Sequence, residues 1–539
     1  MENKKVGSVM VIGAGIAGIQ SSLDLAGSGY KVHLLEQTSA IGGIMAQLDK
    51  TFPTNDCAMC VISPKLVECG RHLNIDLMTN SELVSVDGEA GNFQVEVFKH
   101  PRYVDLDKCT GCGECEMACP VQTASIFDEE LVEKKSIYKL YAQASPNAFV
   151  IDKKETAPCQ ISCPSGIHVQ GYIALAAEGK FQEAYDLIRR NNPFPSVCGR
   201  VCHHPCETDC HRAEYDEPIA IRSIKRFIAD YYHKNIKKMT NTLEPVENSK
   251  EKVAVIGAGP AGLTCAFYLS RMGYKVTIFE KENYTGGMMR NGIPAYRLMR
   301  KELVWEIEQI LKEGIELKLD SPISTPDDFA KLKTANYKSI FVSVGFSFGR
   351  SLNIEGADLN GVTTGIDFLK KVNSGEEVKI GKKVVVIGGG NVAVDVAKSA
   401  LRNGAEVEMV CLESFREMPA HNWEITEALE EGVKVNPSWG PEKIVGVDGK
   451  VTGIVFKKCI SVFDSKRRFN PKFDDSLTEK FDCDDVIIAI GQSSDLSFLE
   501  DSGIGKIAPT LKVDPQTFYT GTDGIFAGGD IVNGPASVV

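Results

Sequence analysis

Two glycine-rich fingerprints constrain this chain most, because each predicts a strand, a tight turn and a helix in that order. Each follows an apolar run and places an acid 23 residues after its first glycine (13 to 36 and 257 to 280). In that setting the backbone approaches a pyrophosphate and the carboxylate accepts a ribose hydroxyl. The predicted dinucleotide-contacting residues are Gly13, Gly15, Gly18 and Glu36 in the first fingerprint, and Gly257, Gly259, Gly262 and Glu280 in the second.

A Gly-Gly pair follows each acid, at Gly42-Gly43 and at Gly286-Gly287. The repetition of turn, acid and glycine pair makes two unrelated surface loops a poor explanation. We therefore predict a flavoprotein with one FAD site around Gly287 and a second FAD site around Gly43. No Ser/His/Asp arrangement or pair of acids stands out, so the catalytic residues stay unknown.

Composition and charge exclude some classes of protein. The 539 residues predict three or four domains, and the net charge of -12 argues against a nucleic-acid surface. The first apolar run begins directly after Met1-Glu2-Asn3-Lys4-Lys5, which leaves no room for a signal peptide, and no run is long enough to span a bilayer. We expect a soluble, cytoplasmic protein. The chain stops soon after Asp530, where a helix covering the flavin would begin, so we expect a piece of a longer protein.

Cysteines are concentrated in one part of the chain, since 13 of the 17 lie between Cys57 and Cys210. A disulfide framework is not expected without a secretory signal. The run Cys109-x2-Cys112-x2-Cys115-x3-Cys119-Pro predicts a [4Fe-4S] cluster. The alternative, a zinc knuckle, fits poorly, because zinc sites pair two CxxC units across a longer gap.

A second group of six cysteines predicts at least one more [4Fe-4S] cluster. Its spacing of four would place the last four on one helical face, although Pro205 argues for a broken turn. The six are Cys159, Cys163, Cys198, Cys202, Cys206 and Cys210. The neighbouring histidines are either ligands or polar neighbours of the cluster; they are His203, His204 and His211.

The remaining cysteines are less specific. Cys57-x2-Cys60 fits a redox dithiol, a pair of cluster ligands, or two buried thiols. Small core residues are the expectation for the isolated ones, which are Cys69, Cys265, Cys411, Cys459 and Cys483.

A third glycine-rich turn predicts the site of a nicotinamide nucleotide. Gly388-x-Gly390-Asn391-x-Ala393 follows four apolar residues, and the next predicted strand ends at Glu413. A carboxylate there accepts the 2′-hydroxyl of NADH and repels the 2′-phosphate of NADPH, so NADH is favoured, although Arg416 is near. The alternative is that Glu413 is a solvated turn residue.

These motifs predict an α/β flavoprotein with two dinucleotide-binding, Rossmann-like domains for FAD and NAD(P), a ferredoxin-like segment and an α-helical iron–sulfur domain. The predicted division is a partial FAD-binding domain at 1–100, a ferredoxin-like segment at 101–155, a helical iron–sulfur domain at 156–245, the first part of an FAD domain at 246–380, an NAD(P) domain at 381–484, and the second part of the FAD domain at 485–539.

Residues 156–539 resemble the glutamate synthase small-subunit family, which includes the large subunit of NADH-dependent ferredoxin:NADP oxidoreductase. The resemblance lies in Asn192 to Cys202, Gly286 to Pro294, Gly388 to Asp395, Glu417 to Ala420, and Gly528-Gly529-Asp530. It implies an FAD that a nicotinamide reduces or oxidises and that is wired through [4Fe-4S] clusters in the helical N-terminal domain, with Gly529 and Asp530 at the flavin. A cysteine pair that this family carries before the position of Cys159 is absent here.

Residues 1–155 resemble the heterodisulfide reductase A family of flavoproteins. The resemblance lies in Gly42 to Ala46, Thr51 to Cys60, Pro64-Lys65, Pro101 to Asp105 and the ferredoxin run. It implies an FAD domain with an inserted ferredoxin segment, used in some members for electron bifurcation. Only the opening third of that family is present.

The leading hypothesis is an FAD-dependent NAD(P)H oxidoreductase subunit that passes electrons through 4Fe-4S clusters to another redox subunit or ferredoxin. Electron bifurcation by this subunit is a further hypothesis. One alternative is a glutamate synthase small subunit that uses NADPH. Another is a redox-sensing scaffold that binds nucleotide without turnover.

Overall fold

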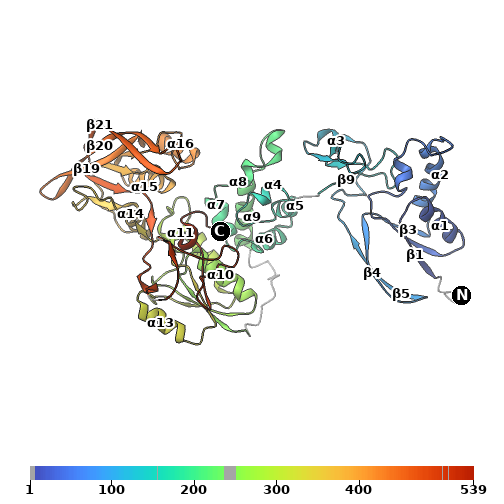
Figure 1. The fold of residues 1–539 in the computed structure, drawn as a ribbon, viewed down its shortest axis with the longest axis horizontal. Helices are drawn as coiled ribbons and strands as arrows, with labels where there is room; N and C mark the ends of the chain where they lie inside the picture. The colour runs from blue at the N-terminus through green and yellow to red at the C-terminus, as the bar shows by residue number, and fades with distance from the viewer. Residues whose placement is uncertain (1–6, 154–155, 236–249, 501, 508, 539) are drawn as a thin grey trace. The chain divides into compact units, whose positions relative to one another are not determined.

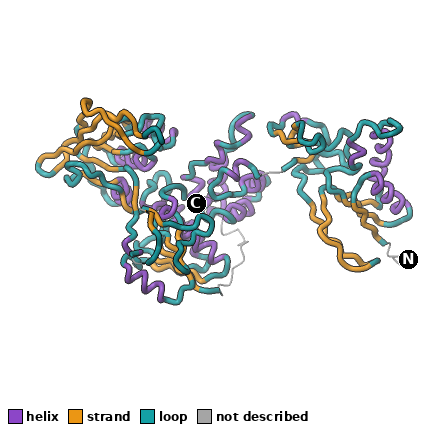
Figure 2. Tube along the Cα trace, in the orientation of Figure 1, coloured by secondary structure: helices purple, strands orange, loops and turns teal. Residues whose placement is uncertain are grey.

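The computed structural model describes residues 7–153, 156–235, 250–500, 502–507 and 509–538. The chain divides into two compact units, each considered separately here. Unit 1 is Met1–Pro158 with Asp209–Ile219, and unit 2 is Cys159–Thr208 with Ala220–Val539. Figure 1 labels the elements of both units, and Figure 2 separates their helices, strands and loops. The division into six segments made from the sequence stays a prediction.

Unit 1 opens with a parallel three-stranded sheet in the order β1-β2-β3. Helix α1 and helix α2 contribute Ile19, Leu23, Ile62 and Leu66 to the core that covers this sheet. The elements are β1 (Ser8–Ile12), α1 (Ile16–Gly27), β2 (Lys31–Leu35), the 3-10 helix η1 (Ile44–Gln47), α2 (Ala58–Arg71) and β3 (Ile75–Met78).

The rest of unit 1 has short elements and few long apolar runs. An antiparallel hairpin is formed by β4 (Ser81–Glu89) and β5 (Asn92–Lys99). The elements that follow are α3 (Glu114–Ala118), β6 (Gln122–Ala124), β7 (Glu133–Lys135), β8 (Ile137–Tyr138) and β9 (Val150–Ile151), and η2 (His211–Glu214) also belongs to this unit.

Unit 2 begins with short helices, in agreement with the predicted α-helical iron–sulfur domain. Phe194 and Val197 are fully buried and join the core formed by α10, which fixes these helices on the first sheet of the unit. The helices are α4 (Pro158–Ile161, at the boundary of the units), α5 (Val169–Ala177), α6 (Phe181–Arg189), α7 (Pro195–Val201), α8 (Pro205–Thr208) and α9 (Ile221–Asn235).

The first sheet of unit 2 is parallel, in the order β12-β11-β10-β13-β26. Its central strand β10 is a continuous buried run, the pattern of a parallel strand covered on both faces. The elements are β10 (Lys252–Ile256), α10 (Pro260–Arg271), β11 (Lys275–Phe279), α11 (Met288–Asn291), α12 (Arg300–Leu311), β12 (Glu316–Lys318), α13 (Pro326–Thr334), β13 (Ser339–Val342), β26 (Ile525–Ala527) and α17 (Asp530–Asn533).

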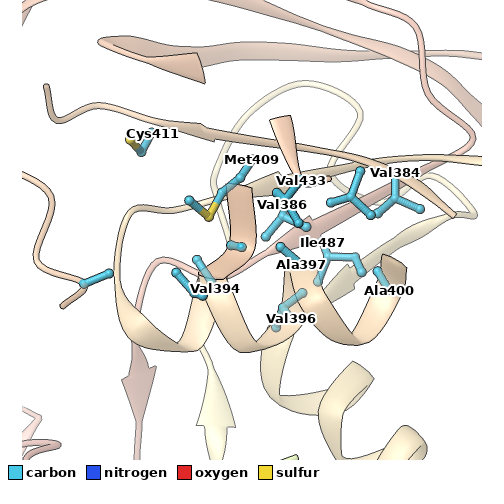
Figure 3. Close-up of a cluster of buried hydrophobic side chains, with 14 of the residues drawn as sticks. Val384, Val386, Val394, Val396, Ala397, Ala400, Met409, Cys411, Val433 and Ile487 are labelled. Carbon is cyan, nitrogen blue, oxygen red and sulfur yellow. The ribbon is translucent and has the colours of Figure 1, made fainter. Parts of the chain in front are cut away.

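The second sheet of unit 2 is also parallel, in the order β15-β22-β16-β17-β18. Figure 3 shows Val394, Ala397 and Ala400 of α15 against the strand residues Val386 and Ile487, all buried. The elements are β15 (Val362–Thr364), α14 (Gly365–Ser374), β16 (Lys383–Ile387), α15 (Asn391–Arg402), β17 (Glu406–Cys411), α16 (Asn422–Glu431), β18 (Lys434–Pro437) and β22 (Asp485–Ile488).

Smaller elements complete unit 2. An antiparallel sheet of β19 (Trp439–Val447), β20 (Lys450–Phe463) and β21 (Phe469–Phe481) packs on the second parallel sheet through Ile444, Ile454 and Phe456. Two further strands, β14 (Phe348–Gly349) and β23 (Gln492–Ser493), form an antiparallel pair. They lie in the two stretches of chain that connect the parallel sheets. The last short elements are η4 (Ser497–Leu499), β24 (Lys506–Ile507) and β25 (Thr510–Leu511).

Among the described residues, no helix combines the length and the apolar character needed to cross a bilayer.

Candidate functional site

The turn between β10 and α10 has the tight geometry that its glycines predicted. Gly257 adopts φ 102°, and a Cβ there would lie 2.7 Å from the Ser343 carbonyl oxygen. A Cβ at Gly262 would lie 1.9 Å from the carbonyl oxygen of Gly257, so α10 packs directly on the turn. Gly259 is the N-cap of α10. The helix N-terminus and its free amides therefore face the turn, as a pyrophosphate site requires.

The predicted acid of this fingerprint reaches back to the same turn. Glu280 follows β11, is 7% exposed, and accepts hydrogen bonds from the amides of Ala258 (2.7 Å) and Glu282 (3.0 Å). Gly287 adopts φ 49°, and a Cβ there would lie 2.8 Å from the Cα of Gly259. Any side chain at Gly287 would therefore push the glycine pair away from the turn.

A cavity of about 700 Å³ opens above this turn. Six of the predicted FAD-binding residues line the cavity. Four come from the second fingerprint and its glycine pair, and two from the family resemblance: Gly257, Gly259, Glu280 and Gly287, then Gly529 and Asp530. Gly262 lies behind them, in the helix. Burial raises the pKa of Asp530, while the amide of Ala536 opposes that rise. The volume lies within the range of small-molecule and cofactor pockets.

Other lining residues were missed by the sequence reasoning. Cys265, expected to be a small core residue, lines the cavity, and burial raises the pKa of its thiol to about 12. Ser343 follows β13, and the carboxyl ends of parallel strands converge at one edge of a sheet, a signal that could have found it. Ile366 and Lys370 of α14 also line the cavity. The cavity is therefore bounded by elements of both parallel layers of unit 2.

The third glycine-rich turn lies between β16 and α15. Gly388 adopts φ 142°, and a Cβ there would lie 2.4 Å from the Ala489 carbonyl oxygen. Gly390 is the N-cap of α15, and Asn391 accepts a hydrogen bond from the His421 amide through Oδ1 (2.9 Å). The turn and the segment around residue 421 are thus held together.

Glu413 lies beside this turn rather than in solvent. Its Oε2 is 2.9 Å from the position that a Cβ on Gly389 would occupy. The side chain is half-buried, and burial is the main reason that its pKa is raised. Arg416, in contrast, is exposed. The interpretation of Glu413 as a solvated turn residue is therefore wrong.

Two sets of contacts join the third turn to the rest of unit 2. Arg297 donates to both carboxylate oxygens of Asp395 on α15 at 2.7 Å, and to Glu424 on α16 at 2.6 Å. The stacked rings of His421 and Trp423 have centroids 4.3 Å apart, and the stacked rings of His203 and His421 have centroids 5.4 Å apart. His204 lies 5.2 Å from Trp423, next to the cysteine-bearing helices.

The second cysteine group is partly assembled within unit 2. Nearby Cys163 and Cys202 raise the pKa of Cys206, and Cys202 raises that of Cys198, although burial is the larger cause in each case. The last four cysteines do not share one helical face, because α7 ends at Val201 and Pro205 begins α8, which is the break that the proline indicated. Cys159, Cys163, Cys198, Cys202 and Cys206 belong to unit 2, whereas Cys210 belongs to unit 1.

The surroundings of this group act on the thiols in opposite directions, and burial dominates, since it raises the pKa of Cys198 and of Cys206 to about 12. The His204 amide donates to Cys202 Sγ (3.3 Å), and Lys225 lowers the pKa of both Cys198 and Cys206 against the effect of burial. The ring of His203 stacks on that of His421, and the ring of His204 packs at a tilt on that of Trp423. Whether these histidines are ligands or polar neighbours of a cluster stays a prediction.

The ferredoxin run in unit 1 turns around its glycines. Gly111 adopts φ 73° and Gly113 adopts φ 90°. Burial is the main cause of the raised pKa of Cys115, and the charges of Cys109 and Cys112 add to it. Cys119, the fourth thiol of the run, is the C-cap of α3. Among the described residues, no three His, Cys, Asp or Glu side chains are close enough to hold one metal ion. The thiolates of a cubane bind different irons and so lie further apart than the ligands of a single ion.

The first fingerprint repeats the geometry of the second one. A Cβ at Gly18 would lie 1.9 Å from the Gly13 carbonyl oxygen, and one at Gly43 would lie 3.1 Å from the Cα of Gly15. Glu36 is 8% exposed and accepts from the Ala14 amide at 2.8 Å. The strand before the turn differs, because its last residue, Ile12, is 59% exposed, against 3% for the corresponding Ile256.

Comparison with known families identifies three segments. Residues 251–539 match the pyridine nucleotide-disulphide oxidoreductase family, residues 141–237 the dihydropyrimidine dehydrogenase domain II with a 4Fe-4S cluster, and residues 102–123 a 4Fe-4S binding domain. The first match confirms the predicted α/β fold with FAD and NAD(P) layers, and the other two confirm the iron–sulfur segments.

Three relatives illustrate the similarity. The beta subunit of NADP(+)-dependent formate dehydrogenase of Moorella thermoacetica is 40% identical over 425 residues, covering 74% of this chain and 60% of the relative. The beta subunit of the Geobacter sulfurreducens NADPH-Fe(3+) oxidoreductase is 38% identical over 468 residues, covering 80% and 68%.

The third relative, the PreT subunit of NAD-dependent dihydropyrimidine dehydrogenase of Escherichia coli, is 33% identical over 389 residues, covering 71% of this chain and 87% of the relative. This chain thus spans 60% of the length of the formate dehydrogenase subunit. It belongs to the pyridine nucleotide-disulphide oxidoreductase family, as an iron–sulfur flavoprotein oxidoreductase that takes FAD, NAD(P)H and 4Fe-4S clusters.

Proposed function

We propose that this chain is the pyridine-nucleotide-oxidising subunit of an electron-transfer complex. Its donor is NADH, and its acceptor is another redox subunit or ferredoxin. The observation that carries the proposal is the cavity of about 700 Å³ beside Glu280, because Ile366 and Lys370 bring the nicotinamide-type layer to the wall of the flavin-type site. When bound, the nicotinamide supplies a hydride, the flavin splits electron pairs, and the clusters carry single electrons.

The cavity fits an FAD by its backbone as well as by its volume. At Gly257, Gly287 and Gly529 a Cβ would lie within 2.8 Å of other atoms. The α10 amides face the place that a pyrophosphate would take. The carboxylate of Glu280 would receive the ribose, and Asp530 would contact the flavin end. The residues proposed to hold this FAD are Gly257, Gly259, Gly262, Glu280, Gly287, Gly529 and Asp530.

The turn at Gly388 would hold the nicotinamide nucleotide. Glu413 borders this turn, and a carboxylate there accepts a ribose hydroxyl but repels a 2′-phosphate. This supports NADH over NADPH as the donor. The residues proposed for this site are Gly388, Gly390, Asn391 and Glu413.

The repeated fingerprint in unit 1 would hold part of a second FAD. Its proposed contacts are Gly13, Gly15, Gly18, Glu36 and Gly43. The proposed ligands of the clusters are Cys109, Cys112, Cys115 and Cys119 in unit 1, with Cys159, Cys163, Cys198, Cys202, Cys206 and Cys210 as the pool for the second group. Gly111 and Gly113 leave the first run free to turn around a cubane, which supports this assignment.

The finer family placement is also a proposal. Residues 156–539 would act as a glutamate synthase small-subunit type of module, and residues 1–155 as the opening of a heterodisulfide reductase A type of flavin domain. Two flavin fingerprints in one chain support electron bifurcation as a further step. The curated relatives are themselves subunits, which supports a partner that receives the electrons.

Anaerobic titration of the purified chain with NADH and with NADPH tests the donor. We expect NADH to bleach the flavin absorbance at lower concentration than NADPH, and Glu413→Gln to reduce that preference. Exposed Glu417→Gln on the same loop is the matched control and should keep the preference of the wild type. Failure of both nucleotides to bleach the flavin would refute the proposal and favour a sensing scaffold.

A further inference from the structure

Lys225 is a buried cation of unit 2 to which the proposed electron path gives no role. It lies in helix α9, and only 5% of the residue is exposed. Among the described residues, none accepts a hydrogen bond or forms an ion pair with its ammonium. A buried charge is costly unless it is paired, so this position calls for an anion that the side chains around it do not supply.

The backbones of α7 and α9 meet directly beside Lys225. A Cβ on Gly199 of α7 would lie 2.7 Å from the Cα of Arg226 on α9. No residue with a side chain could therefore stand at position 199 without separating the two helices. Cys198 is the neighbour of Gly199 in the chain, and Lys225 is the neighbour of Arg226. This close approach brings the cysteine-bearing turn of α7 next to the turn of α9 that carries the cation.

The first turn of α9 is also tied to the loops that carry the other cysteines. Arg222 donates through Nη1 to the carbonyl oxygen of Cys202 at 3.0 Å, and its amide donates to Glu207 Oε1 at 2.7 Å. Lys225 follows Arg222 by three residues, and residues at this spacing are neighbours on one side of a helix. The side of α9 that holds the cysteine loops therefore also carries Lys225.

The charge of Lys225 acts on two thiols of the second cysteine group. It lowers the pKa of Cys198 and of Cys206, and in both cases only burial has a larger effect. The two thiols come from different helices, α7 and α8. The ammonium therefore lies near the space that these thiols share.

A buried tyrosine places further cysteines at the same helix end. Tyr172 of α5 is 1% exposed, and its hydroxyl donates to the carbonyl oxygen of Ile221, the first residue of α9, at 3.4 Å. Burial raises the pKa of this phenol, and the charges of nearby thiols add to the rise; they belong to Cys206, Cys163 and Cys159. Several thiols and one unpaired cation thus gather at the start of α9, a donor set that suits an anionic iron–sulfur cluster.

We propose that Lys225 is the counter-charge of the iron–sulfur cluster held by the second cysteine group, and that it makes this cluster easier to reduce. A cubane bound by thiolates is an anion, and each one-electron reduction adds a negative charge to it. A nearby ammonium stabilises the reduced form more than the oxidised form, because attraction grows with the charge of the anion. The reduced flavin gives the electron and the cluster takes it up, while Lys225 keeps its proton and forms no covalent bond. The inference rests on the proposed cluster in this group.

The test uses the full chain, purified anaerobically with its clusters and reduced by dithionite, so it needs no nicotinamide. A redox titration followed by low-temperature EPR gives the midpoint potential of each cluster. Lys225→Met keeps the apolar stem of the side chain and removes its charge. At a fixed potential we expect about tenfold less reduced than oxidised cluster relative to the wild type, which is a downward shift of about 59 mV for one electron. The potential of the other cluster should stay unchanged.

Two further variants separate the charge from other effects of substitution. Lys225→Arg keeps a cation at the site and should restore a potential close to that of the wild type. Lys234→Met removes an exposed lysine of the same helix and is the matched control, so both potentials should stay unchanged. None of the three variants removes a proposed ligand, and each should keep the iron content of the wild type.

A measurement that shows proximity needs only the wild type. The protein is grown with lysine labelled with ¹⁵N at Nζ, reduced by dithionite, and studied by pulsed EPR, which detects nitrogen nuclei close to the unpaired electron of a cluster. We expect a ¹⁵N coupling in a cluster signal. The same coupling should persist in Lys234→Met and disappear in Lys225→Arg.

Two results would overturn the proposal. One is a Lys225→Met protein with full iron content and unchanged potentials. The other is a wild type in which no cluster signal shows coupling to the labelled nitrogen, a result that depends on no variant. Failure of the proposed function would look different, since the wild type would then hold iron for the ferredoxin run alone, or would keep its flavin oxidised after NADH.

Discussion

Arg297 holds Asp395 by both carboxylate oxygens, at 2.7 Å each, across the two parallel layers of unit 2. Arg297 precedes α12 of the flavin-type layer, and Asp395 lies in the first turns of α15, next to the nicotinamide-type turn. Asp395 is 8% exposed. The pair therefore fixes the third glycine-rich turn, at Gly388, relative to the cavity.

Loss of this contact should destabilise unit 2. Arg297→Ala leaves Asp395 and Glu424 buried without their cation, and removing one partner of a buried pair costs about 3 kcal/mol. Lys370→Ala is the matched control, since its 2.7 Å pair with Glu282 also joins the two layers but Lys370 is 43% exposed. The Lys370→Ala variant should lower the free energy of unfolding by less than about 1 kcal/mol. Urea unfolding compares them, and equal costs would contradict the role given to Arg297.

Gly287→Ala should abolish FAD binding. Its positive φ and the 2.8 Å approach of a Cβ to the Gly259 Cα would force the glycine pair off the turn. Gly375→Ala is the control, because Gly375 has φ 82° with nothing within 4 Å of a Cβ. It carries the same backbone strain of about 1 kcal/mol without the collision. Flavin released on denaturation measures occupancy, and full occupancy in Gly287→Ala would disprove the assignment.

The stability of unit 2 should depend on Glu306 and on pH. Glu306 of α12 is fully buried and accepts the amides of Ser196 (2.6 Å) and Val197 (2.8 Å) at the start of α7. Burial raises its pKa from 4.5 to about 8, against the effect of those amides and of Arg189 and Arg200.

The sign of the pH effect follows from that raised pKa. Between pH 4.5 and about 8, the folded state holds a proton that the unfolded state releases, so stability falls as pH rises through this window. The loss is on the order of a few kcal/mol. Melting temperatures across this window, for the wild type and for Glu306→Gln, provide the test. An identical pH slope in both proteins would show that Glu306 is not the group responsible.

The stack of His421 on Trp423 should couple the third turn to the cysteine-bearing helices. Trp423→Ala removes a ring whose centroid lies 4.3 Å from that of His421 and 5.2 Å from that of His204. We expect this to lower the free energy of unfolding by about 1 kcal/mol. We expect faster amide hydrogen exchange in residues 202–206 and 419–423. Phe415→Ala, at an exposed aromatic residue of the loop before α16, should leave both segments unchanged. Unaltered exchange at residues 202–206 in Trp423→Ala would argue against the coupling.

Local patterns in the sequence predicted the turns of this protein but not the contacts between distant segments. The return of Glu36 and Glu280 to the amides of Ala14 and Ala258 could be predicted, because one strand–turn–helix–strand unit sets that distance. The break at Pro205 was also visible, since proline begins a helix more readily than it continues one.

Contacts that depend on tertiary packing were missed. Arg297 lies 98 residues from Asp395, and Glu306 lies 110 residues from Ser196, and no single motif contains both partners of either contact. Cys265 was predicted to be a core residue because an isolated cysteine carries no spacing signal, yet its position on α10 brings it to the cavity. Only the packing of the layers determines which side of that helix is covered.

Low-temperature EPR of the chain after anaerobic addition of NADH tests the central claim most directly. The claim is that nicotinamide, flavin and the cysteine groups form one electron path. We predict that NADH bleaches the flavin and that the same sample shows the spectrum of reduced [4Fe-4S] clusters. A sample in which the flavin is bleached while clusters reducible by dithionite remain oxidised would contradict the account.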